Sequence, residues 1–383
     1  MLCLQSLWWF YDQNVTKAIK HKIPKIYPIP TESSPLSPFY SDPYKGYARA
    51  FPKWDQTQFP CGPLIPDTTL GKRTPSEEGF LFVKEMKSGS TTLAGITARI
   101  GRNIAQRNFG ANATTSCTVR MVHTRARRYA SRQLAKSFLW SVVREPVSRL
   151  FSKFFHFEVS RKGVRPSLAK FQSFISDNEI NDYAYYFKTL SVRQRLNPYR
   201  TELYEEFLQD LLDGYNFIGI MERFDESLAV LQLLLGLETQ DMLYLSTKTN
   251  GMYDRFRNVC IKIQPTIVTR LMKEYVYSPV VEAFTEGDVL VYQAANRSLD
   301  LTIEQLGRPV VEKAVQRLQW AQKRAEEKCI GGTKFPCSND GKLQDKTDCL
   351  FADVACGYKC LDDFGKSLSE NEDFRSLIDS QLQ

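Results

Sequence analysis

The sequence predicts an α/β fold of three layers, in which helices flank a central parallel β-sheet. Short apolar runs of strand length alternate with longer segments in which apolar residues recur every three or four positions. This alternation is typical of strand-helix units whose strands pair in parallel. With 383 residues, 43% of them hydrophobic and 12% aromatic, the chain can also bury the core that such a sheet requires.

We divide the chain into three parts. Residues 1–79 form a Pro-rich N-terminal stem or wrapping arm, because eleven of the 18 prolines lie between Pro24 and Pro75 and prevent long helices there. Residues 80–308 form the α/β domain, and residues 309–383 a C-terminal helix with a cysteine-rich tail. The apolar segment Leu2–Tyr11 is either a remnant of a signal anchor or an aromatic segment that packs on the domain.

The domain opens with a strand, a loop and a helix. The run Phe80–Val83 predicts a buried strand, and a polar loop follows it from Lys84 to Thr92. Apolar residues then recur at helical spacing from Leu93 to Ile104. Such a unit places the N-terminus of its helix beside the end of its strand.

Three further strands are predicted. They are Val119–Val122, Phe138–Val143 and Tyr215–Ile220. The second leads into Arg144-Glu-Pro146, where proline suits the first turn of a helix that carries Leu150, Phe154 and Phe157 on one side. The last precedes a helix from Glu226 to Leu235, with Asp225 as its predicted cap and Gly236 at its end. Late helices are predicted at Pro279–Arg297 and at Val310–Lys328, the second facing solvent.

Positive charge is concentrated in one segment of a chain whose net charge is +8. Residues 120–170 contain thirteen Lys and Arg but only two acidic residues, Glu145 and Glu158. Such an excess attracts an anionic ligand. Nucleic acid is excluded as a partner, since no DNA- or RNA-binding signature is present.

The nine cysteines point to an oxidising compartment, and five of them fall in the tail: Cys329, Cys337, Cys349, Cys356 and Cys360. Disulfides are favoured over zinc, because the tail has no C-x-x-C pair and no nearby histidine. At least one of the five must pair elsewhere or stay free. Sequons at Asn14, Asn112 and Asn296 permit N-glycosylation of a lumenal chain.

The loop after the first strand has the composition of a phosphate cradle. A helix N-terminus favours an anion, glycine allows close backbone approach, and hydroxyls and a lysine add donors and charge. The residues are Lys87, Ser88, Gly89, Ser90, Thr91 and Thr92. Lys87 precedes the only glycine, so the loop is P-loop-like without being a Walker A motif, which argues against ATP or GTP. An ordinary polar loop is the alternative.

Here the chain resembles the PAPS-dependent sulfotransferases, where PAPS is 3′-phosphoadenosine 5′-phosphosulfate. Lys87-Ser-Gly-Ser-Thr-Thr92 is similar to their 5′-phosphosulfate loop, and Arg144 with Ser152, eight residues later, to their 3′-phosphate motif. The segment from Phe217 to Leu228 resembles the Golgi carbohydrate enzymes of galactose 3-O and uronyl 2-O type. The resemblance covers about residues 80–308.

Physical chemistry independently supports two separate anion sites. The Arg144 guanidinium can bind phosphate through two parallel hydrogen bonds, and Ser152 lies two helical turns further on. A structural salt bridge and an ordinary helix serine are the alternatives for these two residues. We expect Arg149 and Lys153, which flank the motif, to point to solvent or to contribute only to the general positive field.

His123 is the predicted general base. In the 2-O type of the family a histidine between the two cofactor motifs takes the proton, and His123 has that place. Lys87 is expected to stabilise charge on the leaving phosphate. Glu85 is a weaker candidate base, because other members use a glutamate. His156 is expected to be structural, and His21 lies outside the core.

Other residues allow more than one interpretation. Arg125, Arg127 and Arg128 either grip an acidic acceptor or form a solvated basic face. The resemblance implies a late loop that closes over the adenine, in the region of Lys248, Arg255 and Arg257. Tyr183, Tyr185 and Tyr186 either stack on sugar rings or pack in the core.

The sequence thus predicts a sulfotransferase that moves a sulfuryl group from PAPS to a hydroxyl, with a glycan or glycolipid as partner and no metal. The family implies the Golgi lumen, through a type II membrane anchor, or secretion. Two alternatives remain open. They are a P-loop phosphotransferase or kinase that uses ATP and Mg²⁺, and an inactive glycan-binding relative. The acceptor itself has no portable sequence code.

Overall fold

The computed structural model describes residues 45–54, 61–63, 78–110, 115–123, 125–177, 183, 187, 202–248 and 251–368. Within these ranges no helix has the length and apolar character that a membrane crossing requires. The apolar segment Leu2–Tyr11, His21, the sequons at Asn14 and Asn112, and Tyr185 and Tyr186 lie outside the described residues.

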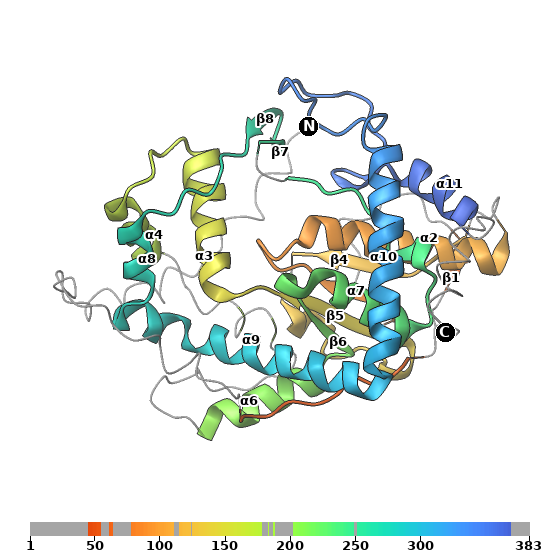
Figure 1. Ribbon diagram of the computed structural model, residues 1–383, viewed down its shortest axis with the longest axis horizontal. Helices are drawn as coiled ribbons and strands as arrows, with labels where there is room; N and C mark the ends of the chain where they lie inside the picture. Colours follow the sequence, from red (N-terminus) through yellow and green to blue (C-terminus); the bar gives the residue numbers. More distant parts are fainter. Residues whose placement is uncertain are drawn as a thin grey trace. The chain divides into compact units, whose positions relative to one another are not determined.

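A four-stranded parallel sheet forms the centre of the domain (Figure 1). Its strands are β4 (Val119–Val122), β2 (Gly79–Val83), β5 (Ser137–Val143) and β6 (Phe217–Ile220), in that spatial order. Every residue of β2, β5 and β6 is buried, as expected for parallel strands that are covered on both faces. The predicted fold class and all four predicted strands are confirmed.

Helices cover this sheet. Helix α2 (Ser90–Phe109) packs against β2 and β4 and buries its predicted apolar face, from Leu93 to Ile104. Helices α7 (Phe224–Leu235) and α9 (Pro279–Leu306) contact β6, and α10 (Arg308–Cys329) lies on α7 (Figure 1). Helix α6 (Glu202–Asp213) contacts α9. One face of α10 is buried, so only its other face is exposed to solvent as expected.

The start of α7 differs from the prediction. Gly236, in the left-handed region at φ 61°, ends the helix as expected. Asp225, however, lies within the first turn, and Arg223 occupies the cap position without a side-chain cap bond. The Asp225 carboxylate instead accepts a hydrogen bond from Gln319 of α10 at 2.8 Å. A tertiary contact therefore replaces the predicted local cap.

The helix after β5 changes type along its length. Helix α3 (Pro146–Phe154) begins at Pro146, and Glu145 caps it by accepting hydrogen bonds from the next two free backbone N–H groups. From Phe155 to Arg161 the chain is a π-helix, a form that is frequent at functional sites. This segment packs with α4 (Leu168–Asp177) and α8 (Arg270–Val276) around a second apolar cluster.

Residues 45–54 are extended and pack on the domain. The Arg49 guanidinium donates to the carbonyl oxygens of Leu212 and Tyr215 at 2.9 and 2.7 Å. The Phe51 ring is buried, and its backbone N–H donates to Thr302 Oγ1 of α9. Further along, β1 (Cys61–Pro63) pairs antiparallel with β3 (Thr115–Cys117), and a disulfide joins Cys61 to Cys117.

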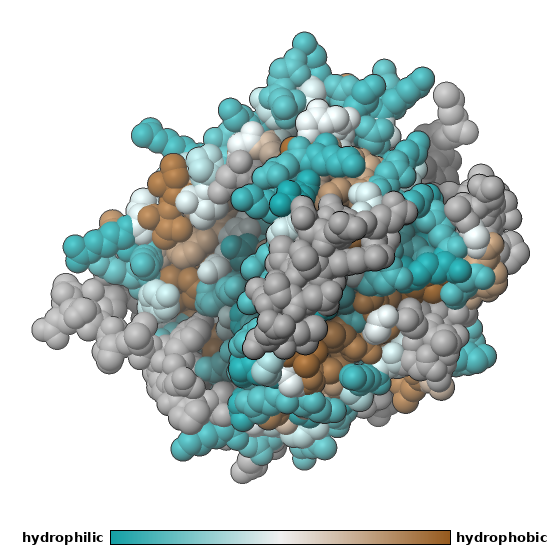
Figure 2. All heavy atoms as spheres, turned by 45° about the vertical axis from the view of Figure 1, so that its right-hand side comes forward, coloured by the Kyte–Doolittle hydropathy of each residue, from teal (hydrophilic) through white to brown (hydrophobic). Residues whose placement is uncertain are grey.

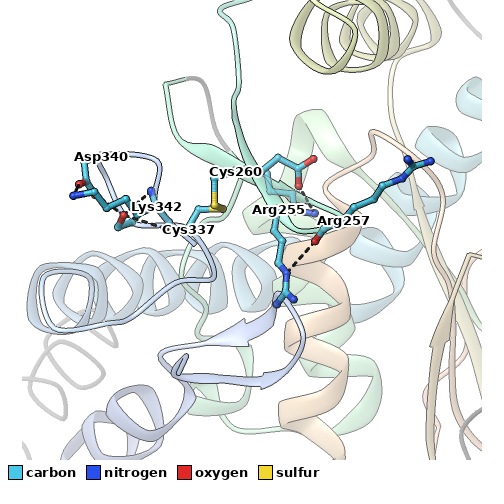
Figure 3. The surroundings of a disulfide bond; sticks show 9 residues. Arg255, Arg257, Cys260, Cys337, Asp340 and Lys342 are labelled. Atoms are coloured by element: carbon cyan, nitrogen blue, oxygen red, sulfur yellow. Dashed lines mark hydrogen bonds and ion pairs between the residues drawn. A yellow bond between two sulfur atoms is a disulfide. The ribbon is translucent and has the colours of Figure 1, made fainter. Parts of the chain in front are cut away.

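The tail is built on disulfides, as predicted. Cys329 pairs with Cys360 of α11 (Tyr358–Leu368), and Cys349 pairs with Cys356 across a hairpin formed by β9 (Cys349–Phe351) and β10 (Val354–Cys356). The fifth cysteine pairs outside the tail: Cys337 is bonded to Cys260 in the hairpin of β7 (Tyr253–Phe256) and β8 (Val259–Lys262) (Figure 3). The tail is therefore covalently attached to the domain.

Hydrophilic residues predominate on the face shown in Figure 2, with smaller hydrophobic patches between them. The third predicted sequon lies inside α9. The Asn296 side chain accepts a hydrogen bond there from Arg223 at 2.9 Å, and Ser298 is fully buried. A helix interior is not the surface loop that N-glycosylation normally uses, so the structure does not favour a glycan at Asn296.

Candidate active site

The candidate site lies where the four parallel strands end. Because their carboxyl ends meet at one edge of the sheet, the residues that follow them lie close together. Val83 of β2 is paired with Val122 of β4, and Val143 of β5 with Ile220 of β6. The chain then continues with the 84–89 loop, His123, Arg144 and Glu222. The geometry of the sheet thus brings together the two predicted cofactor motifs and the predicted base.

The loop between β2 and α2 has the backbone form of an anion cradle. Lys87 has φ 65° and Gly89, the N-cap of α2, has φ 69°, so two left-handed residues turn the chain into the helix. A Cβ on Gly89 would lie 2.7 Å from the Met221 sulfur. The Ser88 hydroxyl is buried and has no hydrogen-bond partner among the described residues. A buried donor without a partner is what a phosphate oxygen would satisfy.

The other residues of the motif surround this turn. Ser90 is buried at the start of α2, whereas Thr91 and Thr92 are half-buried. Both threonines border a narrow gap that Leu245 and Ala355 also line. No acidic residue occupies the first turn of α2. The positive end of the helix is therefore not neutralised by its own side chains.

Arg144 connects the two cofactor motifs. Its Nη1 donates to the Lys87 carbonyl oxygen at 3.2 Å, and its Nε lies 3.9 Å from Glu222 Oε1. The Arg144 backbone N–H donates to the Tyr183 hydroxyl at 2.7 Å, and that hydroxyl donates to the Arg144 carbonyl oxygen at 2.6 Å. Tyr183 is fully buried, so the core-packing interpretation holds for it. Ser152 is half-buried on α3, eight residues after Arg144.

The expectation that Arg149 and Lys153 point to solvent is wrong. Both are buried, at 3% and 8% exposure. Arg149 Nη1 donates to Glu85 Oε1 at 2.9 Å and Nη2 to Asp288 Oδ2 at 2.7 Å. Its guanidinium also lies 4.2 Å from the centre of the Tyr183 ring. The spacing of the motif predicts a helix but does not show that this side of α3 faces two buried carboxylates.

The contact with Arg149 also determines where the Glu85 carboxylate lies. Its carboxylate is 1% exposed and is engaged by Arg149. A general base must be within hydrogen-bond reach of the proton that it removes. The structure instead gives Glu85 a role in fixing the 84–89 loop to α3.

His123 follows β4 and lies beside the loop. Its Nδ1 is 2.8 Å from the Lys84 carbonyl oxygen. As a donor to that carbonyl, Nδ1 carries the proton and Nε2 is left as an acceptor. The residue remains exposed, but the surrounding protein removes part of the hydration of the ring and Lys84 adds positive charge, which lowers the pKa of His123 to about 4. The imidazole is therefore neutral near pH 7 and can accept a proton.

Lys87 is surrounded by other charges. Burial lowers its pKa to about 8, with Asp254 opposing the shift and Arg144 and Lys248 adding to it. The group is still mostly protonated near pH 7, and it lies in an environment that favours an incoming anion. Lys84 is affected similarly, since burial lowers its pKa and Asp353 partly offsets that effect.

The charges around Lys87 include Asp254, a residue that the sequence analysis missed. Asp254 of β7 is 1% exposed, and its Oδ2 accepts from Arg161 Nη2 at 2.7 Å while its Oδ1 lies 2.9 Å from Lys248 Nζ. His156 Nε2 is 3.6 Å from Asp254 Oδ2, and burial, followed by the Lys87 charge, lowers the pKa of His156 to about 3. A lone aspartate in a short hairpin carries no sequence signal, and only the tertiary structure identifies it.

The remaining basic residues lie at the periphery. Arg125, Arg127 and Arg128 are exposed, the first at the N-cap of the short helix Ala126–Tyr129 and the other two within it. Figure 3 shows Arg255 and Arg257 next to the Cys260–Cys337 disulfide, with Arg255 Nε donating to the Arg257 carbonyl oxygen at 3.4 Å. Lys248, in contrast, is half-buried and forms ion pairs with the buried Asp254 and with Asp353. Of the three late basic residues, it is the one that acts electrostatically on Lys87 and His123.

Comparison with known proteins identifies the family. A family model described as galactose-3-O-sulfotransferase matches residues 101–348. The match includes His123, Arg144, Ser152 and the β7–β8 hairpin, but it begins after the 87–92 loop and ends before β9. A search of curated proteins and a search of solved structures found no match. The family match spans more than half of the chain and agrees with the α/β fold and the paired motifs at the sheet edge. The chain therefore belongs to the galactose-3-O-sulfotransferase family.

Proposed function

We propose that this sulfotransferase uses PAPS as its donor and sulfates a hydroxyl of a glycan or glycolipid. The observation that carries the proposal is the convergence of the two motifs: the Arg144 guanidinium donates to the Lys87 backbone at the edge of the sheet where His123 also lies. A nucleotide with phosphate groups at both ends of its ribose needs two adjacent anion sites of this kind.

The chain fits this donor at the level of individual atoms. Ser88 supplies a buried hydroxyl without a described partner, and Gly89, at φ 69°, turns the loop into the N-terminus of α2. The 87–92 loop would hold the 5′-phosphosulfate, while Arg144 and Ser152 would hold the 3′-phosphate. PAPS supplies the activated sulfuryl group when it is bound. Lysine and arginine provide the positive charge that a metal supplies in many phosphoryl-transfer enzymes, so the proposal involves no metal.

Proton transfer is assigned to His123. Its Nδ1 is held by the Lys84 carbonyl oxygen, so its Nε2 can accept the proton of the attacking hydroxyl. Lys87, on the donor side, would stabilise the negative charge that develops on the departing phosphate oxygen. Because the His123 pKa is about 4, the base is in its reactive neutral form throughout the neutral range.

The acceptor is proposed only as a class. The family name points to a galactose hydroxyl, and the exposed Arg125, Arg127 and Arg128 are available to bind an acidic sugar near His123. The family and the four disulfides support the Golgi lumen or the secretory route. An ATP-dependent phosphotransferase is less well supported, because the loop places its lysine before the glycine. An inactive glycan-binding relative would bind sugar without turnover.

Calorimetry with the spent donor, 3′-phosphoadenosine 5′-phosphate (PAP), tests the proposal. We expect micromolar binding to the wild-type chain, a loss of at least about tenfold in Arg144→Ala, and no response to ATP. Arg270→Ala is the matched control, because the Arg270 side chain is 91% exposed on α8 and its ion-pair partner among the described residues is its helical neighbour Glu274. Absence of PAP binding, or a preference for ATP, would overturn the proposal. Release of PAP in the presence of PAPS and a galactoside then distinguishes an enzyme from an inactive relative.

A further inference from the structure

The cysteine-rich tail contributes a carboxylate to the candidate site. Asp353 lies in the two-residue turn between β9 and β10, and it forms an ion pair with Lys248 Nζ through Oδ2. The family match ends at residue 348, just before this hairpin. Asp353 therefore lies outside the segment that identifies the family.

The position of the turn is fixed from several directions. The Cys349–Cys356 disulfide closes the hairpin, and β10 packs against α2. A Cβ on Gly95 of α2 would lie only 2.9 Å from the Ala355 backbone nitrogen, so the helix and the hairpin are in close contact. The preceding part of the tail is bonded to the β7–β8 hairpin through Cys260–Cys337 (Figure 3). Asp353 is thus held beside the loop at the start of α2.

Lys248 stands between two carboxylates from different hairpins. Its Nζ lies 2.9 Å from Asp254 Oδ1 of β7, and it contacts Asp353 on the other side. Asp254 in turn accepts from Arg161 of the π-helix. The result is a chain of alternating charges, Asp353, Lys248, Asp254 and Arg161, that runs from the tail to the segment behind the 3′-phosphate motif.

Residues with strained backbone conformations cluster around this chain of charges. Five described residues other than glycine have positive φ: Lys87, Lys248, Arg257, Ala352 and Ala355. Lys87 lies in the 87–92 loop, and Lys248 carries the ammonium between the two carboxylates. Arg257, Ala352 and Ala355 lie in the two hairpins that supply these carboxylates. Such conformations cost of order 1–3 kcal/mol each and persist where the surrounding structure imposes them. The strain indicates that the position of Lys248 between the two carboxylates is specifically maintained.

We propose that Asp353 is a positioning residue of the sulfotransfer site, which acts by holding the Lys248 ammonium beside Lys84, Lys87 and His123. The inference rests on the proposed function, since it assigns a role within that site. The Lys248 charge influences Lys84, Lys87, His123 and His156, so its position affects both the donor loop and the base. Asp353 carries no part of the reaction itself. Without it, Lys248 keeps its contact with Asp254 but loses the contact that directs it toward the loop.

This role separates turnover from donor binding. Asp353→Asn removes a negative charge from an anion site, so PAP affinity should stay within about threefold of wild type or become tighter. Displacement of the Lys248 ammonium should lower kcat by about 10- to 100-fold, because small displacements of groups in an active site reduce rates by factors of this size. Asp353→Glu, which restores the carboxylate, should recover part of kcat. Asp345→Asn is the matched control, because Asp345 is an exposed tail residue and should leave kcat unchanged.

A pH profile supplies a readout that a purely structural role would not move. Asp353 raises the pKa values of Lys84 and Lys248, so its removal lowers both and the two ammonium groups lose their protons at lower pH. The alkaline limb of kcat/KM should therefore shift to lower pH in Asp353→Asn but not in Asp345→Asn.

The outcomes distinguish this inference from the proposed function. Wild-type turnover combined with an Asp353→Asn variant of unchanged kcat and unchanged pH profile would overturn the inference alone. A variant that loses kcat, PAP affinity and thermal stability together would also overturn it, because a folding defect would explain the result. Failure of the wild-type chain to bind PAP would refute the proposed function and, with it, the inference.

Discussion

Replacement of Arg149 tests how much stability depends on the buried ion pairs that α3 forms with the 84–89 loop and with α9. One guanidinium bridges Glu85 and Asp288, each no more than 1% exposed, with nitrogen-to-oxygen distances of 2.9 and 2.7 Å. Removing one partner of a buried ion pair costs about 3–5 kcal/mol, because the remaining charge keeps its desolvation penalty. The contact with the Tyr183 ring adds up to ~2 kcal/mol. We expect Arg149→Ala to lose at least about 3 kcal/mol, a large fraction of a typical domain stability of ~5–15 kcal/mol.

The loss of folding stability in Arg149→Ala should depend on pH. In Arg149→Ala the two carboxylates are buried without the guanidinium, so their folded-state pKa values rise above the unfolded values of about 4. The penalty is then greatest above those raised values and shrinks as the carboxylates gain protons at lower pH. Urea denaturation with disulfides intact, at about pH 7.5 and about pH 5, measures this difference between variant and wild type. Arg149→Lys should lose less, because it keeps the charge but cannot bridge both carboxylates.

Two results would contradict this reasoning. An equal loss of stability at both pH values would assign the effect to packing against Tyr183 rather than to charge. A loss no greater than that of the exposed control Arg270→Ala would mean that the two carboxylates do not need the guanidinium.

Two further predictions concern the donor loop. Gly89→Ala should weaken PAP binding by at least about tenfold, because φ 69° disfavours an L-residue and the new Cβ would lie 2.7 Å from a methionine sulfur, so the loop must shift. Gly110→Ala, at φ 90° at the other end of α2, strains the backbone away from the loop and is the control for a general effect on the helix. An equal effect of the two substitutions on calorimetric PAP affinity would mean that the loss does not come from the loop. PAP affinity should also fall as pH rises through about 8, where Lys87 loses its proton, and this fall should be smaller in Lys87→Arg, which stays charged. Calorimetry across that range checks the second prediction, and identical profiles for the two proteins would refute it.

The sequence predicts the sheet and its edge well, because local patterns determine them. Apolar runs bounded by polar loops locate the four strands, and the rule that parallel strands end at one edge places His123 beside the loop that follows β2. The paired motifs locate Arg144 in the same way. Each of these predictions depends on residues within one strand or on the segment that directly follows it.

The predictions fail where long-range contacts decide the outcome. Arg149 and Lys153 have the composition of a solvent-facing side of α3, but α3 packs against α9 and both side chains are buried. Arg149 is paired there with Asp288 and lies over the Tyr183 ring. Asp225 has the residue type of a helix cap but accepts a hydrogen bond from α10 instead. Asp254 gives no signal at all, because its partners lie far away in the sequence. No local pattern contains this information.

The acidic residues of the site explain how it can hold so many cations before an anion arrives. Two unit charges 4 Å apart repel by about 4 kcal/mol at an effective dielectric constant of 20, so several clustered lysines and arginines would separate without counter-charges. Glu222 lies beside Arg144, and Asp254 and Asp353 hold Lys248 from two sides. These carboxylates fix the cations in place, and they do so without occupying the 87–92 loop. An anion that binds in the loop therefore meets charges that are already positioned, and part of that arrangement depends on the β9–β10 hairpin, which lies beyond the family match.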